Sequence, residues 1–195
     1  MNFDFSNLTN PTVLISAVVV VLLVGIAVAL AMHEKRKKTE ELRRRFGSEY
    51  DRALQEDRNS RKAEAKLLAR IKRVEHLRIH ELTAAERTRY IGEWEAVQAR
   101  FIDHPRGAVT EADELVNSLL QARGYPVAAF EQRAADISVD HARLVDPYRS
   151  AFAITSRAGK NEATTEELRT ALIHYRALFE ELLQIKTPLE TRVLV

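Results

Sequence analysis

The chain has 195 residues, with 30 Lys and Arg against 28 Asp and Glu, and it contains no cysteine. This length accommodates one modest domain and an appendage. The lack of cysteine excludes disulfide bridges, thiolate zinc sites, iron–sulfur clusters and cysteine nucleophiles. Six glycines and five prolines are too few for a turn-rich β-architecture, so the composition predicts an all-α protein with long helices.

Residues 13–32 are the most apolar segment of the chain. They carry no charge, and only Ser16 and Gly25 interrupt the aliphatic side chains. In helical form the segment spans about 30 Å, which is the thickness of a bilayer's hydrocarbon core. Pro11 is well placed in the first turn of such a helix. We therefore expect a transmembrane helix at 13–32, preceded by a short extracytoplasmic tail at 1–12.

The flanking charge predicts the orientation of this helix. Residues 1–12 contain no Lys or Arg, whereas seven basic residues follow the apolar segment: Lys35, Arg36, Lys37, Lys38, Arg43, Arg44 and Arg45. The positive-inside rule then places the N-terminus outside and the rest of the chain in the cytoplasm. The competing interpretation is a signal peptide cleaved after 29–31, but an acidic N-terminus and a long apolar run are atypical of one.

Residues 33–80 are expected to form a charged, helical juxtamembrane neck, interrupted near 56–60. Residues 33–73 carry a net charge of +7, and residues 74–195 a net charge of −4. A basic stretch beside a membrane is attracted to anionic lipid by about 1 kcal/mol per residue. The seven basic residues named above are therefore candidate lipid-headgroup contacts, although a topology signal alone also explains them. No nucleic-acid-binding motif accompanies the charge, so we expect no nucleic-acid partner.

Residues 81–186 are expected to form a compact bundle of four to five amphipathic helices. Thr83 and Thr164 each begin a capping box, with a Glu three residues later. Helix breaks are predicted at 103–105 and 124–126 because of their Pro and Gly residues.

Residues 138–140 are predicted to form a turn, and residues 141–157 a helix. Pro147 within it predicts either a fresh helix or a kink. Residues 187–195 are expected to be a flexible tail.

A polar cluster is the main candidate for chemistry. It consists of Asp136, Ser138, Asp140 and His141. Acids and a histidine at a helix junction can orient a proton-transfer group, but Ser and Asp also cap helices, which is the favoured interpretation. His76 and His80 have i,i+4 spacing without a third ligand. We predict no catalytic residues, no cofactor and no metal.

Three stretches resemble a family of uncharacterised bacterial proteins, whose members are described only as hypothetical, membrane or secreted. They are LRRRFGSEYDR at 42–52, FEQRAADISVDH at 130–141 and HYRALFEEL at 174–182. The resemblance covers roughly residues 40–184. It implies a bacterial source and a recurrent helical domain, and it transfers no activity and no functional residue.

These features predict a single-pass bacterial inner-membrane protein with a cytoplasmic helical domain. The expected role is a non-enzymatic interaction or scaffold module that binds an unidentified protein, with a homo-oligomer among the candidate assemblies. One alternative is an enzyme or ligand-binding domain that uses residues 136–141. The other is an oligomeric membrane stalk, similar in architecture to the peripheral stalk of ATP synthase.

Overall fold

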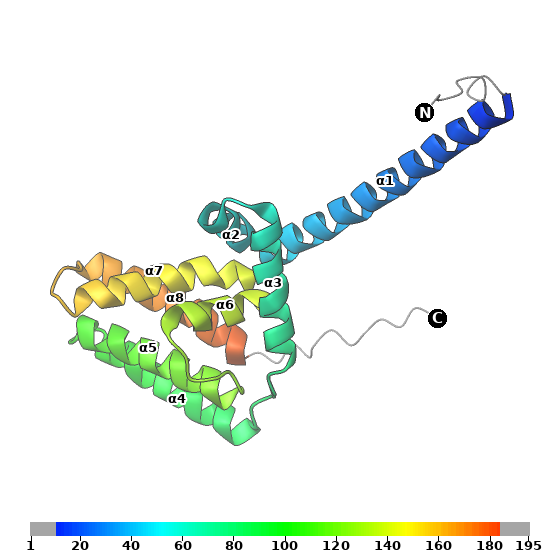
Figure 1. Cartoon of the computed structure of the whole chain (residues 1–195). Helices are drawn as coiled ribbons and strands as arrows, with labels where there is room; N and C mark the ends of the chain where they lie inside the picture. Colours follow the sequence, from blue (N-terminus) through cyan, green and yellow to red (C-terminus); the bar gives the residue numbers. More distant parts are fainter. Residues whose placement is uncertain (1–10, 184–195) are drawn as a thin grey trace. The chain divides into compact units, whose positions relative to one another are not determined.

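The computed structural model describes residues 11–183, and over this range it contains eight helices and no strands (Figure 1). The prediction of an all-α chain is confirmed. The chain divides into two compact units, residues 1–44 and 45–195. Each unit is described by itself.

The first unit consists of most of α1 (Pro11–Phe46). The helix begins at the proline that the sequence placed in its first turn. Within the described range, α1 holds the one segment that is long and apolar enough to cross a membrane, with a mean hydropathy of 2.1 and none of it buried. The predicted apolar helix is confirmed, and it continues without a break into the basic residues.

The second unit begins with two helices that the sequence assigned to the neck. Gly47, with φ 53°, separates α1 from α2 (Ser48–Asp57). Positive φ is readily adopted only by glycine. Next comes α3 (Ser60–Glu75), whose cap Asn59 accepts a hydrogen bond from the Arg61 backbone N–H at 3.0 Å. Since α3 packs against α2 and α6, α2 and α3 belong to the second unit, which begins at residue 45.

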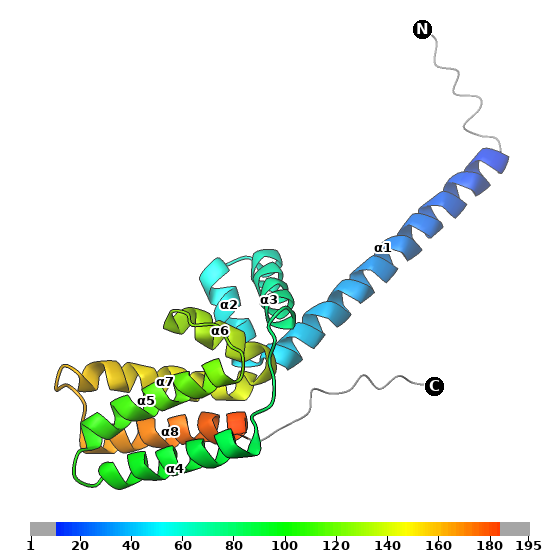
Figure 2. The same ribbon diagram turned by 90° about the horizontal axis from the view of Figure 1, so that it is seen from below.

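Five helices complete the second unit (Figure 2): α4 (Ala84–Arg100), α5 (Pro105–Ala122), α6 (Phe130–Asp140), α7 (Ala142–Ala158) and α8 (Thr165–Leu183). Both capping boxes are confirmed. At α8, the Thr164 backbone N–H donates to Glu167 at 2.8 Å, and the Glu167 N–H donates to the Thr164 hydroxyl at 3.3 Å. The backbone bond, the Arg157 side chain and the Thr164 hydroxyl lower the pKa of Glu167 to about 2.

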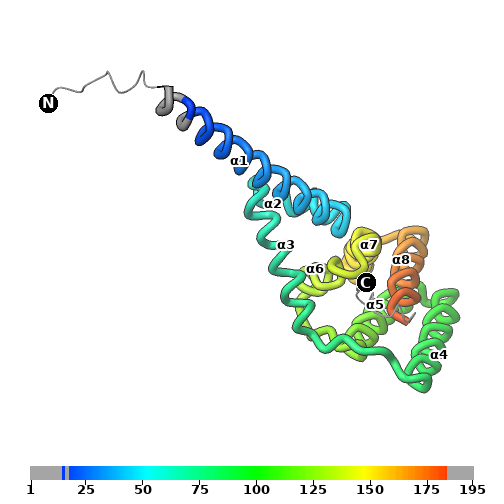
Figure 3. The backbone as a smooth tube through the Cα atoms, turned by 90° about the vertical axis from the view of Figure 1, so that its right-hand side faces the viewer, coloured from blue at the N-terminus to red at the C-terminus, as the bar shows by residue number. Residues whose placement is uncertain are grey.

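The last five helices of the second unit, α4 to α8, share one apolar core. α5 packs against α4, α7 and α8, α7 packs against α8, and α6 connects α7 to α3. In Figure 3, which looks nearly along these helices, α4, α5, α7 and α8 surround a common interior. Tyr90, Tyr148, Tyr175 and Phe179 are among its largest fully buried side chains.

Two local predictions are corrected here. The turn expected at 138–140 is wrong, because α6 continues through Asp140. Both Ile137 and Val139 are buried, so tertiary packing keeps this polar stretch helical despite its turn-forming residues. Pro147 does not begin a fresh helix, since it lies inside α7. The tail expected at 187–195 lies outside the described residues.

The helix break at Gly124 is confirmed and has a steric cause. Gly124 follows α5 with φ 95°. A Cβ at this position would lie 2.3 Å from the Arg78 carbonyl oxygen, which belongs to the segment between α3 and α4. Gly124 therefore permits both the reversal after α5 and the close approach of that segment.

Candidate functional site

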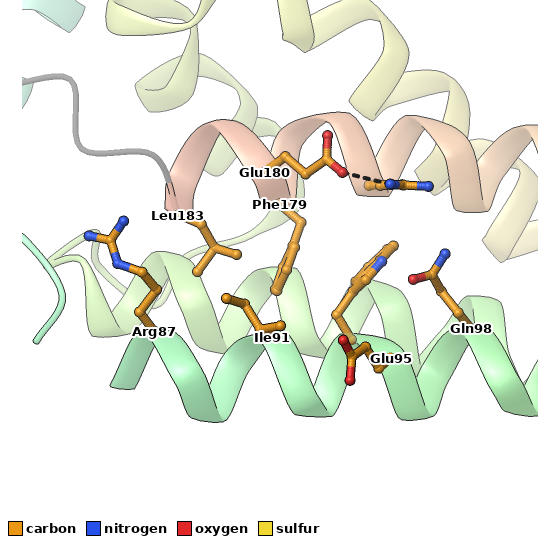
Figure 4. Close-up of a pocket in the computed structure, with 9 residues that line it drawn as sticks. Arg87, Ile91, Glu95, Gln98, Phe179, Glu180 and Leu183 are labelled. Carbon is orange, nitrogen blue, oxygen red and sulfur yellow. Dashed lines mark hydrogen bonds and ion pairs between the residues drawn. The ribbon is translucent and has the colours of Figure 1, made fainter. Parts of the chain in front are cut away.

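One groove on the second unit lies between α4 and α8. Its volume is about 450 Å³. It is lined by residues of α4 (Arg87, Ile91, Trp94, Glu95 and Gln98) and of α8 (Arg176, Phe179, Glu180 and Leu183) (Figure 4). The two helices are antiparallel here, because Arg87 lies opposite Leu183 and Gln98 lies at the far end.

The floor of the groove is aromatic. The rings of Trp94 and Phe179 stack with their centroids 4.7 Å apart. Both residues are buried, whereas Ile91, one turn before Trp94, keeps 42% of its surface exposed. Ile91 is therefore the one exposed apolar side chain among the residues that line the groove.

The sequence explains why α4 leaves this face open. The i,i+4,i+7 stripe of Tyr90, Trp94 and Val97 is buried in the core, and α4 packs principally against α5. Ile91, Glu95 and Gln98 lie one position further round the helix and so face outward over α8.

The charges at the rim of the groove differ in their pairing. Arg176 donates to Glu180 at 2.7 Å, one turn apart on α8. Arg87 and Glu95 form no ion pair within residues 11–183. These two groups can therefore pair with charges on a bound partner.

The predicted polar cluster is divided among separate partners. Asp136, 1% exposed, accepts hydrogen bonds from Nε of Arg73 at 2.8 Å and from Nε2 of Gln132 at 2.9 Å. The Ser138 hydroxyl donates to the Ala135 carbonyl in its own helix at 2.6 Å. Asp136 therefore links α6 to α3, whereas Ser138 bonds within α6.

The other two members of the cluster also face different neighbours. Asp140 lies 3.8 Å from Arg45. His141 Nδ1 lies 3.3 Å from Glu181. Burial lowers the pKa of His141, although the negative charges of Glu181 and Asp140 oppose that shift. The capping interpretation is wrong, because Asp136 and Ser138 lie inside α6 and no side-chain cap bond forms at the start of α7.

A buried charge network that the sequence analysis missed connects four helices. Glu49 of α2 is 1% exposed and accepts hydrogen bonds from Arg70 of α3 and Arg149 of α7, each at 3.1 Å. Arg149 also pairs with Glu131 of α6. The sequence signal was present: Glu49 interrupts the apolar stripe formed by Phe46, Tyr50 and Ala53.

A second missed group lies inside the bundle. Burial raises the pKa of Asp113 on α5. The Asn117 amide donates to its carboxylate at 3.3 Å, and the Tyr148 hydroxyl donates to the Asn117 carbonyl oxygen, also at 3.3 Å. These polar atoms connect α5 to α7 within an otherwise apolar interior.

The basic residues at the end of α1 fall into two groups. Lys35, Arg36, Lys37 and Lys38 are exposed, as are Arg43 and Arg44. Arg45 belongs to the second unit, where its Nε donates to the Val139 carbonyl at 3.2 Å. The lipid contact stays a prediction for all seven residues; Arg45, which is exposed as well, also contacts the second unit.

No metal site is formed by the described part of the chain, in which no group of three His, Asp or Glu residues is placed to hold an ion. His76 and His80 do not share a helix, because α3 ends at Glu75. The chain matches no protein-family model, no curated protein and no solved structure.

Proposed function

We propose that this protein is a single-pass membrane protein that presents a helical interaction module without catalytic activity. The observation that carries the proposal is the exposed apolar surface of α1. Its large apolar residues from Val18 to Met32 are 47–70% exposed. A continuous apolar surface of this length is unfavourable in water and favourable in a bilayer.

We assign the orientation from charge. The exposed basic residues that end α1 favour the cytoplasmic side, and the resemblance to a bacterial family favours the inner membrane. The second unit is then cytoplasmic, with the groove between α4 and α8 as its docking surface. Lys35, Arg36, Lys37 and Lys38 are in position to contact anionic headgroups.

The charge networks support a structural rather than a catalytic role for the buried acids. Glu49 and Asp136 each accept hydrogen bonds from arginines on other helices. An acid bonded in this way to arginines of other helices joins those helices together. The alternative enzyme at residues 136–141 would need these side chains to converge on one cavity, and they engage separate partners instead.

The experiment that tests this proposal is membrane extraction with intact-mass analysis. The full chain is expressed in a bacterium, and its membranes are washed with alkaline carbonate. We expect the protein to stay in the membrane pellet with residues 1–32 attached. A soluble product lacking these residues would identify a cleaved signal peptide and contradict the proposal.

A further inference from the structure

One face of α4 carries opposite charges placed symmetrically about an exposed aliphatic residue. Arg87, Ile91 and Glu95 follow at four-residue intervals, so they lie along one side of the helix, with about 6 Å of axial rise between neighbours. All three line the groove. The positive group and the negative group are therefore equally distant from Ile91.

The other charged side chains of α4 already have partners. Glu86 completes the capping box with Thr83, Arg89 lies 3.8 Å from Glu93, and Arg100 pairs with Glu111 of α5. Among the charged side chains of α4, only Arg87 and Glu95 have no ion pair or hydrogen-bond partner within residues 11–183. They are the two that flank Ile91.

We propose that the groove between α4 and α8 binds the same face of a second copy of this chain. A two-fold axis perpendicular to α4 and passing at Ile91 makes the two α4 helices antiparallel. Arg87 then meets Glu95 of the partner subunit, and the same pair forms again on the other side of the axis. A surface that is complementary to itself in this way is the requirement for a two-fold dimer.

The apolar part of the groove has the same symmetry. Ile91 lies on the axis, where it packs against Ile91 of the partner subunit over the stacked rings of Trp94 and Phe179. Two other aliphatic side chains in this part of the chain are exposed: Ile102, two residues beyond the end of α4, and Ile173 on α8. They are 83% and 58% exposed.

This inference rests on the proposed function in treating the groove as a docking surface, and it does not require the membrane anchor. Anchoring both copies in one bilayer would raise their local concentration and favour the dimer. The charge pairs lie at a rim, so they set the register of the dimer more than its affinity.

A cysteine cross-link tests the axis directly, because the chain has no cysteine of its own. We would introduce Ile91→Cys into the full chain and treat the soluble and membrane fractions with a short bis-maleimide. The matched control is Ala96→Cys, which is exposed on the side of α4 that faces α5. A residue on a two-fold axis meets its own copy, so we expect a cross-linked dimer for Ile91→Cys and little for Ala96→Cys.

Charge exchange tests the pairing. In the Ile91→Cys background, Arg87→Glu alone or Glu95→Arg alone places like charges opposite each other twice, and we expect cross-linking to fall about three- to tenfold. The double exchange restores both pairs and should restore the yield. Unchanged far-UV circular dichroism confirms that each variant stays folded.

Three outcomes would overturn the proposal: equal cross-linking at positions 91 and 96, a double exchange that fails to rescue, or cross-linking that emerges only after residues 184–195 are removed. The last would show that the chain's own C-terminal segment occupies the groove. Cross-linking is scored in soluble and membrane fractions alike, so failure of the anchor and failure of the dimer are distinguishable.

Discussion

Replacing Glu49 by Gln should destabilise the second unit more than any other isosteric change in α2. The variant keeps the shape of the side chain and removes the charge that pairs with Arg70 and Arg149. These two arginine side chains are only 16% and 11% exposed. Breaking a buried ion pair by removing one partner costs about 3–5 kcal/mol. Since solvent reaches part of both arginines and Arg149 keeps Glu131, we expect about 3 kcal/mol, at the lower end of that range.

Thermal unfolding of the full chain in mild detergent measures this cost, followed by circular dichroism and by Trp94 emission. For a domain of this size, about 3 kcal/mol corresponds to a midpoint lowered by roughly 6–12 °C. The control is Glu56→Gln, also on α2, which removes an exposed i,i+4 pair with Arg52 at 3.4 Å and should cost no more than about 0.5 kcal/mol. Equal midpoints for the two variants would refute the structural role of the buried network.

Three further predictions concern the turn, a capping box and the anchor. Gly124→Ala should lower the free energy of unfolding by more than about 1 kcal/mol, because it adds a Cβ against backbone at a residue with positive φ. Gly92→Ala, in the middle of α4 with no atom close to the new Cβ, should raise it by about 0.5–1 kcal/mol. Denaturant titration compares the two variants. The pKa of Glu167 is lowered from 4.5 to about 2 in the fold. The stabilisation that Glu167 provides is therefore present above pH 4.5 and is lost as the pH falls towards 2. The difference in the free energy of unfolding between wild type and Glu167→Gln should shrink over that interval. Val21→Arg, at the middle of the apolar segment, should lower membrane insertion by about 2.5–3.5 kcal/mol, whereas Met32→Arg, beside the basic residues, should have little effect; a glycosylation-based insertion assay compares them.

The sequence predicts helix boundaries correctly where a local rule decides them. Thr83 and Thr164 mark helix starts by their capping boxes, and Gly124 ends α5 because the backbone there needs positive φ. Local rules failed at residues 138–140, where burial of Val139 in the core outweighs the turn preference of its neighbours.

The groove between α4 and α8 could not be predicted from the sequence, because it depends on which helices become neighbours. Nothing in the local pattern shows that Ile91 faces Phe179 of α8, since 88 positions separate them. The same holds for Asp136, which resembles a cap in sequence and pairs with Arg73 in the fold. The apolar segment was the exception, because a bilayer selects it by composition alone.

The central claim is that α1 is retained and crosses a bacterial inner membrane with the second unit inside. Single-cysteine variants Phe5→Cys and Glu190→Cys, treated in intact cells with a membrane-impermeant thiol reagent, test it most directly. The account predicts that the cysteine at position 5 is labelled and that the one at position 190 is labelled only after the cells are permeabilised. Labelling at position 190 in intact cells, without labelling at position 5, would contradict it.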